Sequence, residues 1–201
     1  MSRTKRWGVE ETKRRIQDSA IKALNRKEYH ECLMDEIAVS TGIAKGTIYL
    51  YFHSKKDLYA ALMVRMINDM KALVDEVHAE DLQPIRKLRV LLQRLHGFIG
   101  AHSHALLILR EQTKPSRGKA QEKVQKAFED LFHGMSLIVE NGIYTKEIKS
   151  YPSTLVSALF FSALIVAARF KVKKCLSTYD ISIDTIADIL LHGIAAKGKT
   201  S

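Results

Sequence analysis

The sequence predicts an all-α fold, and three observations support that prediction. The chain has 201 residues with only 10 glycines and 3 prolines, so it carries few of the turn residues that a many-stranded sheet requires. Helix-forming residues dominate throughout. Apolar residues recur every three or four positions in several long segments, which is the period of a helix with one buried face. With 46% hydrophobic residues, the chain can fill one large or two small cores.

The charge balance favours an anionic partner. The formal net charge is +10 and the isoelectric point is about 9.6, which suits DNA or a membrane surface, although the charge can also serve solubility alone. The apolar run at 155–168 is shorter than the roughly 18 to 20 residues that cross a bilayer, so we expect a buried helix and no membrane partner. The N-terminus lacks the apolar segment of a secretory signal. Cys32 and Cys175 show no metal-ligand spacing, which predicts reduced thiols in a cytoplasmic protein.

The first expected helix runs from about Glu10 to Lys27. A basic arm at 2–7 precedes it, and such an arm can follow DNA phosphates or remain a solvated tail. Within the helix the apolar positions repeat at helical spacing and form one stripe: Ile16, Ala20, Ala23 and Leu24. This pattern predicts the support helix of a three-helix unit.

Residues 41–59 form the most informative stretch. Gly42 follows a short periodic segment at 35–41, where a residue that accepts positive φ can end a helix and turn the chain. A second helix at 45–52 would then present two faces. The packed stripe comprises Ala44, Ile48 and Phe52, and the outer face comprises Gly46, Thr47, Tyr49 and Leu50.

A third helix is expected to begin at Ser54, because Asp57 lies three positions later in a capping-box spacing. Lys55 and Lys56 in its first turn oppose the helix dipole, which indicates a nearby polyanion. Two helices joined by a tight turn, the second with a polar and aromatic outer face, form a helix-turn-helix. In that motif the second helix enters the major groove of DNA.

The joined pattern resembles the N-terminal signature of the tetracycline-repressor (TetR) family of bacterial transcriptional regulators, over roughly the first quarter to third of the chain. The residues that carry the resemblance are Ile37-Ala38, Gly42-Ile43, Lys45 to Tyr49, Tyr51-Phe52 and Ser54 to Leu58. The resemblance implies a helix-turn-helix DNA-binding domain at 1–53 and a larger helical effector-binding and dimerisation domain at 54–201. It also implies a cytoplasmic, ligand-responsive repressor that binds a palindromic operator as a homodimer.

The resemblance assigns DNA contacts to a set of residues in and after the second helix. The side-chain chemistry supports part of this assignment. Gly46 lets the backbone approach the groove, and Thr47 and Leu50 suit bases or a thymine methyl. Tyr49 and the charged or polar groups that follow the helix suit phosphates. The full set is Lys45, Gly46, Thr47, Tyr49, Leu50, Tyr51, His53 and Lys55.

The approach to this helix departs from the family. Cys32-Leu33 stands where the family has Thr followed by Ser or Thr, and a hydroxyl there caps the helix and donates to a phosphate. The lost cap would cost on the order of 1 kcal/mol. We expect Leu33 to pack into the core and Glu36 to reach back to the helix start. Asp35 does not suit a phosphate.

The remainder of the chain predicts further helices. A long helix from Ser54 to about His78 is followed by a break at 83–84. Periodic segments then predict helices from Ile85, at 105–111, and over 124–138 with an end at Asn141-Gly142. A loop at 113–118 separates two of them, and Pro152 opens the next helix.

The last two helices, at 155–170 and 183–194, carry more apolar surface than the others. They can complete a monomer core, or pack as the four-helix dimer interface that the resemblance implies. Several side chains of the middle helices can line a pocket for an apolar or amphipathic effector, or serve as plain core. These residues are Phe98, His102, Phe128, Phe132, Met135, Phe160 and Phe161.

The sequence contains no catalytic motif. It lacks the nucleophile elbow, the zinc-protease motif, the phosphate-binding glycine loop and the CxxC pair, so we expect no enzyme and no cofactor. His96, His102 and His104 lie close in sequence without a ligand partner, which favours ordinary histidines over a metal site. The competing hypothesis is a helical small-molecule or lipid-binding protein that does not act on DNA.

Overall fold

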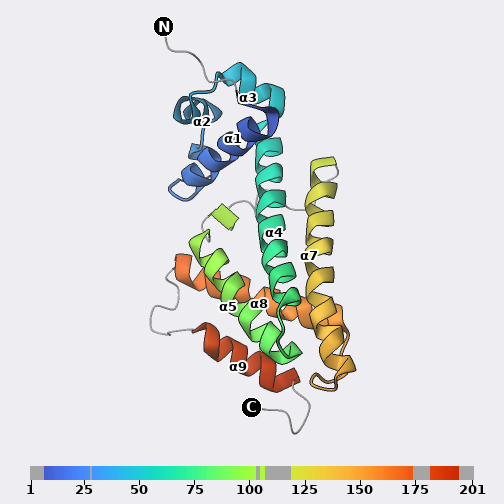
Figure 1. Ribbon diagram of the computed structural model, residues 1–201. Coiled ribbons are helices and arrows are strands. Elements are labelled where there is room, and N and C mark those ends of the chain that lie inside the picture. Colours follow the sequence, from blue (N-terminus) through green and yellow to red (C-terminus); the bar gives the residue numbers. More distant parts are fainter. Residues whose placement is uncertain (1–6, 28, 103–104, 107–118, 174–181, 195–201) are drawn as a thin grey trace. The chain divides into compact units, whose positions relative to one another are not determined.

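The computed structural model describes residues 7–27, 29–102, 105–106, 119–173 and 182–194, and every extended regular element in these ranges is a helix (Figure 1). The all-α prediction is therefore confirmed. Among the helices described, none has the length and apolar composition to cross a membrane. The basic arm at 2–6, the predicted helix beyond residue 106, the loop at 113–118, His104 and Cys175 lie outside the described residues.

The chain forms two compact units. Unit 1 comprises Met1–Met63 with His104–Val124, and unit 2 comprises Val64–Ser103 with Gln125–Ser201. The predicted domain boundary after residue 53 stays a prediction. The two units are described separately below.

Unit 1 contains the first residues of α7 (Lys119–Tyr144) and is built on three whole helices and the beginning of a fourth. They are α1 (Val9–Leu24), α2 (Met34–Thr41), α3 (Lys45–Tyr51) and the first part of α4 (Lys55–Ala79), with a short 3-10 turn at Tyr29–Glu31. Three residues of the predicted α1 stripe, Ile16, Ala20 and Leu24, have no exposed surface, whereas the fourth, Ala23, is half-buried. The helix begins where the Thr12 hydroxyl donates to the Gly8 carbonyl at 2.9 Å. This core holds α2 and α3 in place.

Unit 2 contains the rest of α4 with α5 (Pro84–Ala101), most of α7 (Lys119–Tyr144), α8 (Ser153–Lys173) and α9 (Ile183–Ile194). Helix α5 packs against α8 and α9, and α4 lies beside α7 (Figure 1). The α4 and α7 backbones approach closely at Gly134, where an added Cβ would lie 3.2 Å from Val74. The buried Lys87 ammonium donates to the His78 carbonyl at 2.6 Å and so closes the C-terminal end of α4.

The predicted end of α7 at Asn141-Gly142 is wrong, because the helix continues to Tyr144. The residue that takes the left-handed conformation is Lys146, with φ of 60°. The Gly142 carbonyl accepts the Ile148 N–H at 3.0 Å, and a Cβ on Gly142 would lie 2.4 Å from the Ile148 side chain. The glycine is therefore needed for the close return of the chain after the helix, and not for a turn of its own.

Helix α8 is buried on one face within a single chain. Val156, Phe160 and Leu164 are buried, whereas Leu155 and Leu159 are exposed on the other face. On α9 the fully buried positions are Ala187 and Leu191. The apolar residues at helical spacing on α9 would form a stripe of Ile183, Ile186, Leu190 and Ile194, but the first three are half-buried, and the Ile194 side chain lies outside the description. The unit thus leaves apolar surface uncovered on its last two helices.

Candidate nucleic-acid interface

The turn between α2 and α3 has the geometry that its glycine predicts. Gly42 lies in the left-handed region with φ of 67°, and its N–H donates to the Val39 carbonyl at 3.3 Å. The Ile43 N–H donates to the Ala38 carbonyl at 3.2 Å, so the pair of bonds forms a Schellman motif. A side chain other than glycine would be strained at this φ. The turn fixes where α3 begins.

Helix α3 buries one stripe and leaves the other side open. Ile48 has no exposed surface and Phe52 is buried, as predicted. Ala44 was predicted to share this stripe, but it is exposed. The reason is that Ala44 is the N-cap, with φ and ψ of −57° and 138°, and so lies outside the helical periodicity. Ile43, one position earlier, is buried in its place.

The eight residues predicted to contact DNA all lie on accessible surface of α3 or directly after it. Leu50 is 77% exposed, although it is a large apolar side chain. No heavy atom lies within 4 Å of a Cβ built on Gly46, so the backbone is open at that point. The remaining members are exposed or half-buried: Lys45, Thr47, Tyr49, Tyr51, His53 and Lys55. Their contact with DNA stays a prediction.

The start of α4 follows the expected cap. The Asp57 N–H donates to the Ser54 hydroxyl at 3.1 Å, and the Leu58 N–H donates to the Ser54 carbonyl at 3.1 Å. The Lys55 ammonium lies 5.8 Å from the centre of the buried Tyr59 ring. Partial burial lowers the pKa of Lys55, because it penalises the charged form. The helix start is therefore held both by its cap and by an aromatic contact.

The start of α2 differs from the expectation. Leu33 was predicted to enter the core but is exposed, and Cys32 is fully buried instead. Leu33 is the N-cap, in an extended conformation, with no side-chain cap bond. Burial raises the pKa of the Cys32 thiol, so it stays protonated and behaves as a small apolar side chain. Cys32 therefore supplies the packing that we assigned to Leu33.

The two carboxylates in the first turn of α2 each bind a lysine. Glu36 was expected to reach back to the helix start, but its carboxylate accepts from the Lys27 ammonium at 2.9 Å. Asp35 pairs with Lys45, the first residue of α3, at 2.7 Å. The hydrogen bond with Asp35 raises the pKa of the Lys45 ammonium, and the one with Glu36 raises that of Lys27. Neither pair follows from sequence spacing, because each joins different elements.

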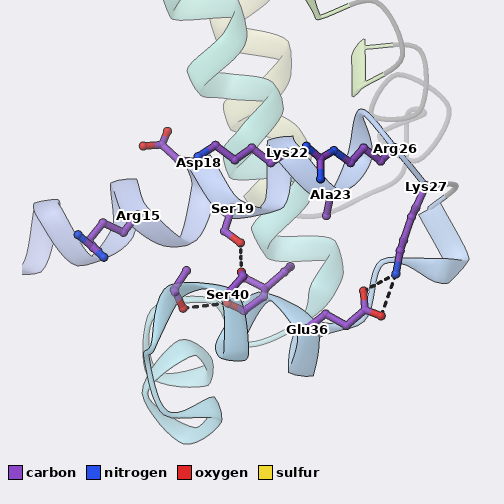
Figure 2. Close-up of a pocket in the computed structure, with 11 residues that line it drawn as sticks. Arg15, Asp18, Ser19, Lys22, Ala23, Arg26, Lys27, Glu36 and Ser40 are labelled. Carbon is purple, nitrogen blue, oxygen red and sulfur yellow. Dashed lines mark hydrogen bonds and ion pairs between the residues drawn. The ribbon is translucent and has the colours of Figure 1, made fainter.

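A groove of about 520 Å³ lies between α1 and α2, and the sequence did not indicate it (Figure 2). Hydroxyls of Ser19 and Ser40 hydrogen-bond across it, and the Lys27–Glu36 pair lies at one end. Its charged lining is mainly basic, with Arg15, Lys22, Arg26 and Lys27 against Asp18 and Glu36. This groove adds positive charge to unit 1 beside the helix-turn-helix.

The residues predicted to line an effector pocket lie on α5, α7 and α8 of unit 2. The Phe132 ring lies 6.3 Å from Phe128 and 5.4 Å from Phe161, so these three rings form a cluster between α7 and α8. The ring of Phe98 on α5 pairs at 4.7 Å with that of His102, the residue directly after the helix. Met135 and Phe160 are buried in the core. Within the described residues, no group of three His, Cys, Asp or Glu side chains is placed to hold a metal ion.

Comparison with known proteins agrees with this geometry. A family model described as "Bacterial regulatory proteins, tetR family" matches residues 16–62. The fatty acid metabolism regulator protein of Bacillus subtilis (strain 168) is 23% identical over 134 residues, which are 67% of this chain and 69% of that protein.

Two solved structures share the fold over nearly the whole chain. One is the transcriptional regulator FadR from Bacillus subtilis in complex with stearoyl-CoA, with a TM-score of 0.71 and 19% identity over 89% of this chain and 95% of that one. The other is the fatty acid degradation regulator FadR from Bacillus halodurans, with a TM-score of 0.74 and 21% identity over 94% and 98%. The matched residues contain α2, α3 and the turn between them. Over residues 16–62 the chain therefore matches the helix-turn-helix region of bacterial regulatory proteins of the tetR family, and its fold is that of solved transcriptional regulators.

Proposed function

We propose that the protein is a ligand-responsive repressor that acts in the cytoplasm and binds a palindromic operator as a homodimer. The observation that carries the DNA-binding part is the open face of α3. An exposed leucine, an exposed tyrosine and an unobstructed glycine stand together on a short helix whose other side is fully packed. Such a face lets the backbone and the side chains approach base edges in a major groove.

Individual roles follow from side-chain chemistry. Gly46 permits close backbone approach, and Thr47 and Leu50 contact bases. The hydroxyls of Tyr49 and Tyr51 donate hydrogen bonds to the phosphate backbone of the operator. The phosphate contacts also include His53 and Lys55, which come after the helix and fix its register without reading sequence.

The homodimer is supported by the uncovered face of α8. Leu155, Leu159 and Val166 are exposed at spacings of four and seven, which places them on one side of the helix. On α9, Ile189 is also exposed. A recognition helix of 7 residues reads few bases, and a two-fold dimer doubles the site that is read. We therefore assign α8 and α9 to the dimer interface.

The effector is proposed to be a long-chain acyl-CoA, an amphipathic molecule with an apolar tail. The solved Bacillus subtilis relative is in complex with stearoyl-CoA. The support within this chain is the aromatic cluster between α7 and α8, which offers apolar contact to an acyl chain. The proposed lining is Phe98, His102, Phe128, Phe132, Met135, Phe160 and Phe161.

The effector would act by changing the spacing of the two recognition helices. Two half-sites one helical turn apart, about 34 to 36 Å, accept both helices only at one spacing. An effector that binds better to the other spacing shifts the population toward it and releases DNA.

The test begins with an operator selected in vitro from random duplex DNA by the full-length protein. We expect a palindrome, with affinity that falls steeply as salt rises. Stearoyl-CoA should weaken operator binding, whereas free coenzyme A should not. Replacement of Lys45, Tyr49 and Lys55 together by Ala should abolish operator binding and preserve binding of stearoyl-CoA. Enrichment of no sequence, with affinity that ignores salt, would exclude the DNA-binding role and leave a lipid or small-molecule binder.

A further inference from the structure

The ion pair between Asp35 and Lys45 joins the two helices of the DNA-binding motif at their N-terminal ends. The Lys45 ammonium lies 2.7 Å from the Asp35 carboxylate, and the two side chains are 55% and 62% exposed. Lys45 is the first residue of α3 and Asp35 lies in the first turn of α2. The structure therefore presents a donor and an acceptor side by side, next to the open backbone at Gly46.

The position of this pair matters because the N-terminal residues of a recognition helix are the ones that reach base edges. A lysine alone would serve any phosphate or any acceptor in the groove. A carboxylate beside it changes this, because it is repelled by phosphates and by base acceptors. Lys45 fills only part of the carboxylate's accepting capacity, and its other lone pairs are matched in the groove only where the DNA offers a donor.

A G·C base pair offers both partners on its major-groove edge. Guanine presents the O6 and N7 acceptors that suit lysine, and cytosine presents the N4 amino donor that suits Asp. We infer that Asp35 is a specificity-determining residue, which reads one G·C base pair in each half-site together with Lys45. This inference rests on the proposed DNA-binding function. Where the DNA has a different base pair at this position, the Asp35 carboxylate faces acceptors, and the affinity for that DNA falls.

The neighbouring residue supplies a matched control. Glu36 lies in the same turn, carries the same charge, is 45% exposed and pairs with Lys27 at 2.9 Å. Its partner lies beyond the end of α1, however, and not on α3. Asp35→Asn and Glu36→Gln therefore remove the same charge from the same helix turn, but only the first changes the group beside the recognition helix.

The experiment is a parallel in vitro selection from random duplex DNA with the full-length wild type, Asp35→Asn, Glu36→Gln and Lys45→Gln. The wild type and Glu36→Gln should enrich a palindrome with a fixed G·C pair at one position of each half-site. Asp35→Asn and Lys45→Gln should enrich the same palindrome with that position relaxed. Exchange of this pair for A·T should cost the wild type about tenfold or more in affinity, and Asp35→Asn about twofold.

Non-specific binding gives a second readout on a random-sequence duplex of the same length. Asp35→Asn and Glu36→Gln should both bind it somewhat more tightly, because each loses one negative charge. Equal gains in affinity for the random duplex would show that the loss of one charge does not explain why the two variants differ in operator specificity. Circular dichroism of all variants verifies that the exposed substitutions leave the helices folded.

Three outcomes would overturn the inference. The first is that Asp35→Asn retains the full wild-type discrimination at every position, and the second is that Glu36→Gln relaxes the same position as Asp35→Asn. Relaxation of different positions by Asp35→Asn and Lys45→Gln would show that the two side chains do not read together. In each case the palindrome and its salt dependence still support the proposed function. A wild type that enriches no sequence overturns the proposed function and this inference together.

Discussion

The outer faces of α3 and α8 both expose leucine side chains, but the residues around those leucines differ. On α3, Leu50 is 77% exposed and stands among a glycine, a tyrosine and a lysine. On α8, Leu159 is 54% exposed, and Leu155 and Val166 share its side of the helix. Leu50 is a single apolar group within a polar face, whereas Leu159 is one of three large apolar side chains on the same side of its helix.

This difference distinguishes two kinds of partner. Exposed apolar side chains that share one helix face are unfavourable in water, and burial against a similar face gains about 25 cal/mol for each Å² covered. A single apolar side chain among polar groups instead suits a mixed surface, such as a major groove with its thymine methyls. Exposure alone therefore does not identify a binding partner. The neighbouring side chains on the same helix face do.

The largest expected effect comes from a charge on the α8 stripe. Leu159→Glu should convert the proposed dimer to a monomer, because the carboxylates would be desolvated against apolar side chains. Operator affinity should fall by about a hundredfold or more, since two linked half-sites gain that much from being bound together. Sedimentation equilibrium and titration with the selected operator measure both effects.

The control for this variant is Tyr144→Glu, at an exposed apolar position near the end of α7. It should leave the dimer intact. A dimeric Leu159→Glu protein with normal operator affinity would show that the α8 stripe is not the interface.

A second substitution should destabilise unit 2 without changing the outer face of α3 or of α8. Gly142→Ala would place a Cβ 2.4 Å from the Ile148 side chain and 3.1 Å from Pro84, so we expect about 1 to 3 kcal/mol of destabilisation. Gly97 is a helical glycine in the same unit with no atom within 4 Å of its Cβ position. Gly97→Ala should be neutral or stabilising by roughly 0.5 to 1 kcal/mol. Urea unfolding distinguishes the two, and equal stabilities would contradict the close packing at Gly142.

A third prediction tests the single leucine of α3. Leu50→Ala should lower operator affinity about tenfold with no change in the salt slope, because an apolar base contact carries no charge. Val39 on α2 is a matched control, since it is apolar and 84% exposed in the same unit. Val39→Ala should bind as the wild type does. Equal losses of affinity from Leu50→Ala and Val39→Ala would show that the outer face of α3 has no special role in binding the operator.

The smallest expected effect concerns the cap that follows α3. Ser54→Ala removes the acceptor for the Asp57 N–H and should destabilise the protein by about 1 kcal/mol. Ser54→Asp retains an acceptor and should remain close to wild type in thermal unfolding. A Ser54→Ala protein as stable as the wild type would show that this cap does not stabilise α4.

Local chemistry made much of the fold predictable. Gly42 takes the left-handed conformation that its place after a short helix requires, and Ser54 caps α4 as the spacing to Asp57 indicates. The burial of Ile48 and Phe52 follows from helical period. These features depend on residues within a few positions of each other, which is why spacing suffices to predict them.

Other features depend on segments that meet only after folding. Helical period placed Ala44 in the core, but the residue is the N-cap of α3 and its ψ of 138° is not helical. Cys32 is buried and Leu33 is exposed, which depends on the conformation of the chain entering α2. Gly142 faces Ile148 because the chain returns after α7, and no periodic pattern records that return.

The sequence by itself therefore determined the all-α class, the helix-turn-helix and the residues of its outer face, since periodicity, a glycine turn and a cap are local properties. Only the tertiary structure decided that Asp35 pairs with Lys45, that Glu36 pairs with Lys27, and that α8 keeps one apolar face uncovered. The reason is physical. An ion pair between two helices and the coverage of a helix face depend on which surfaces fold against each other, and spacing along one helix carries no information about its neighbour.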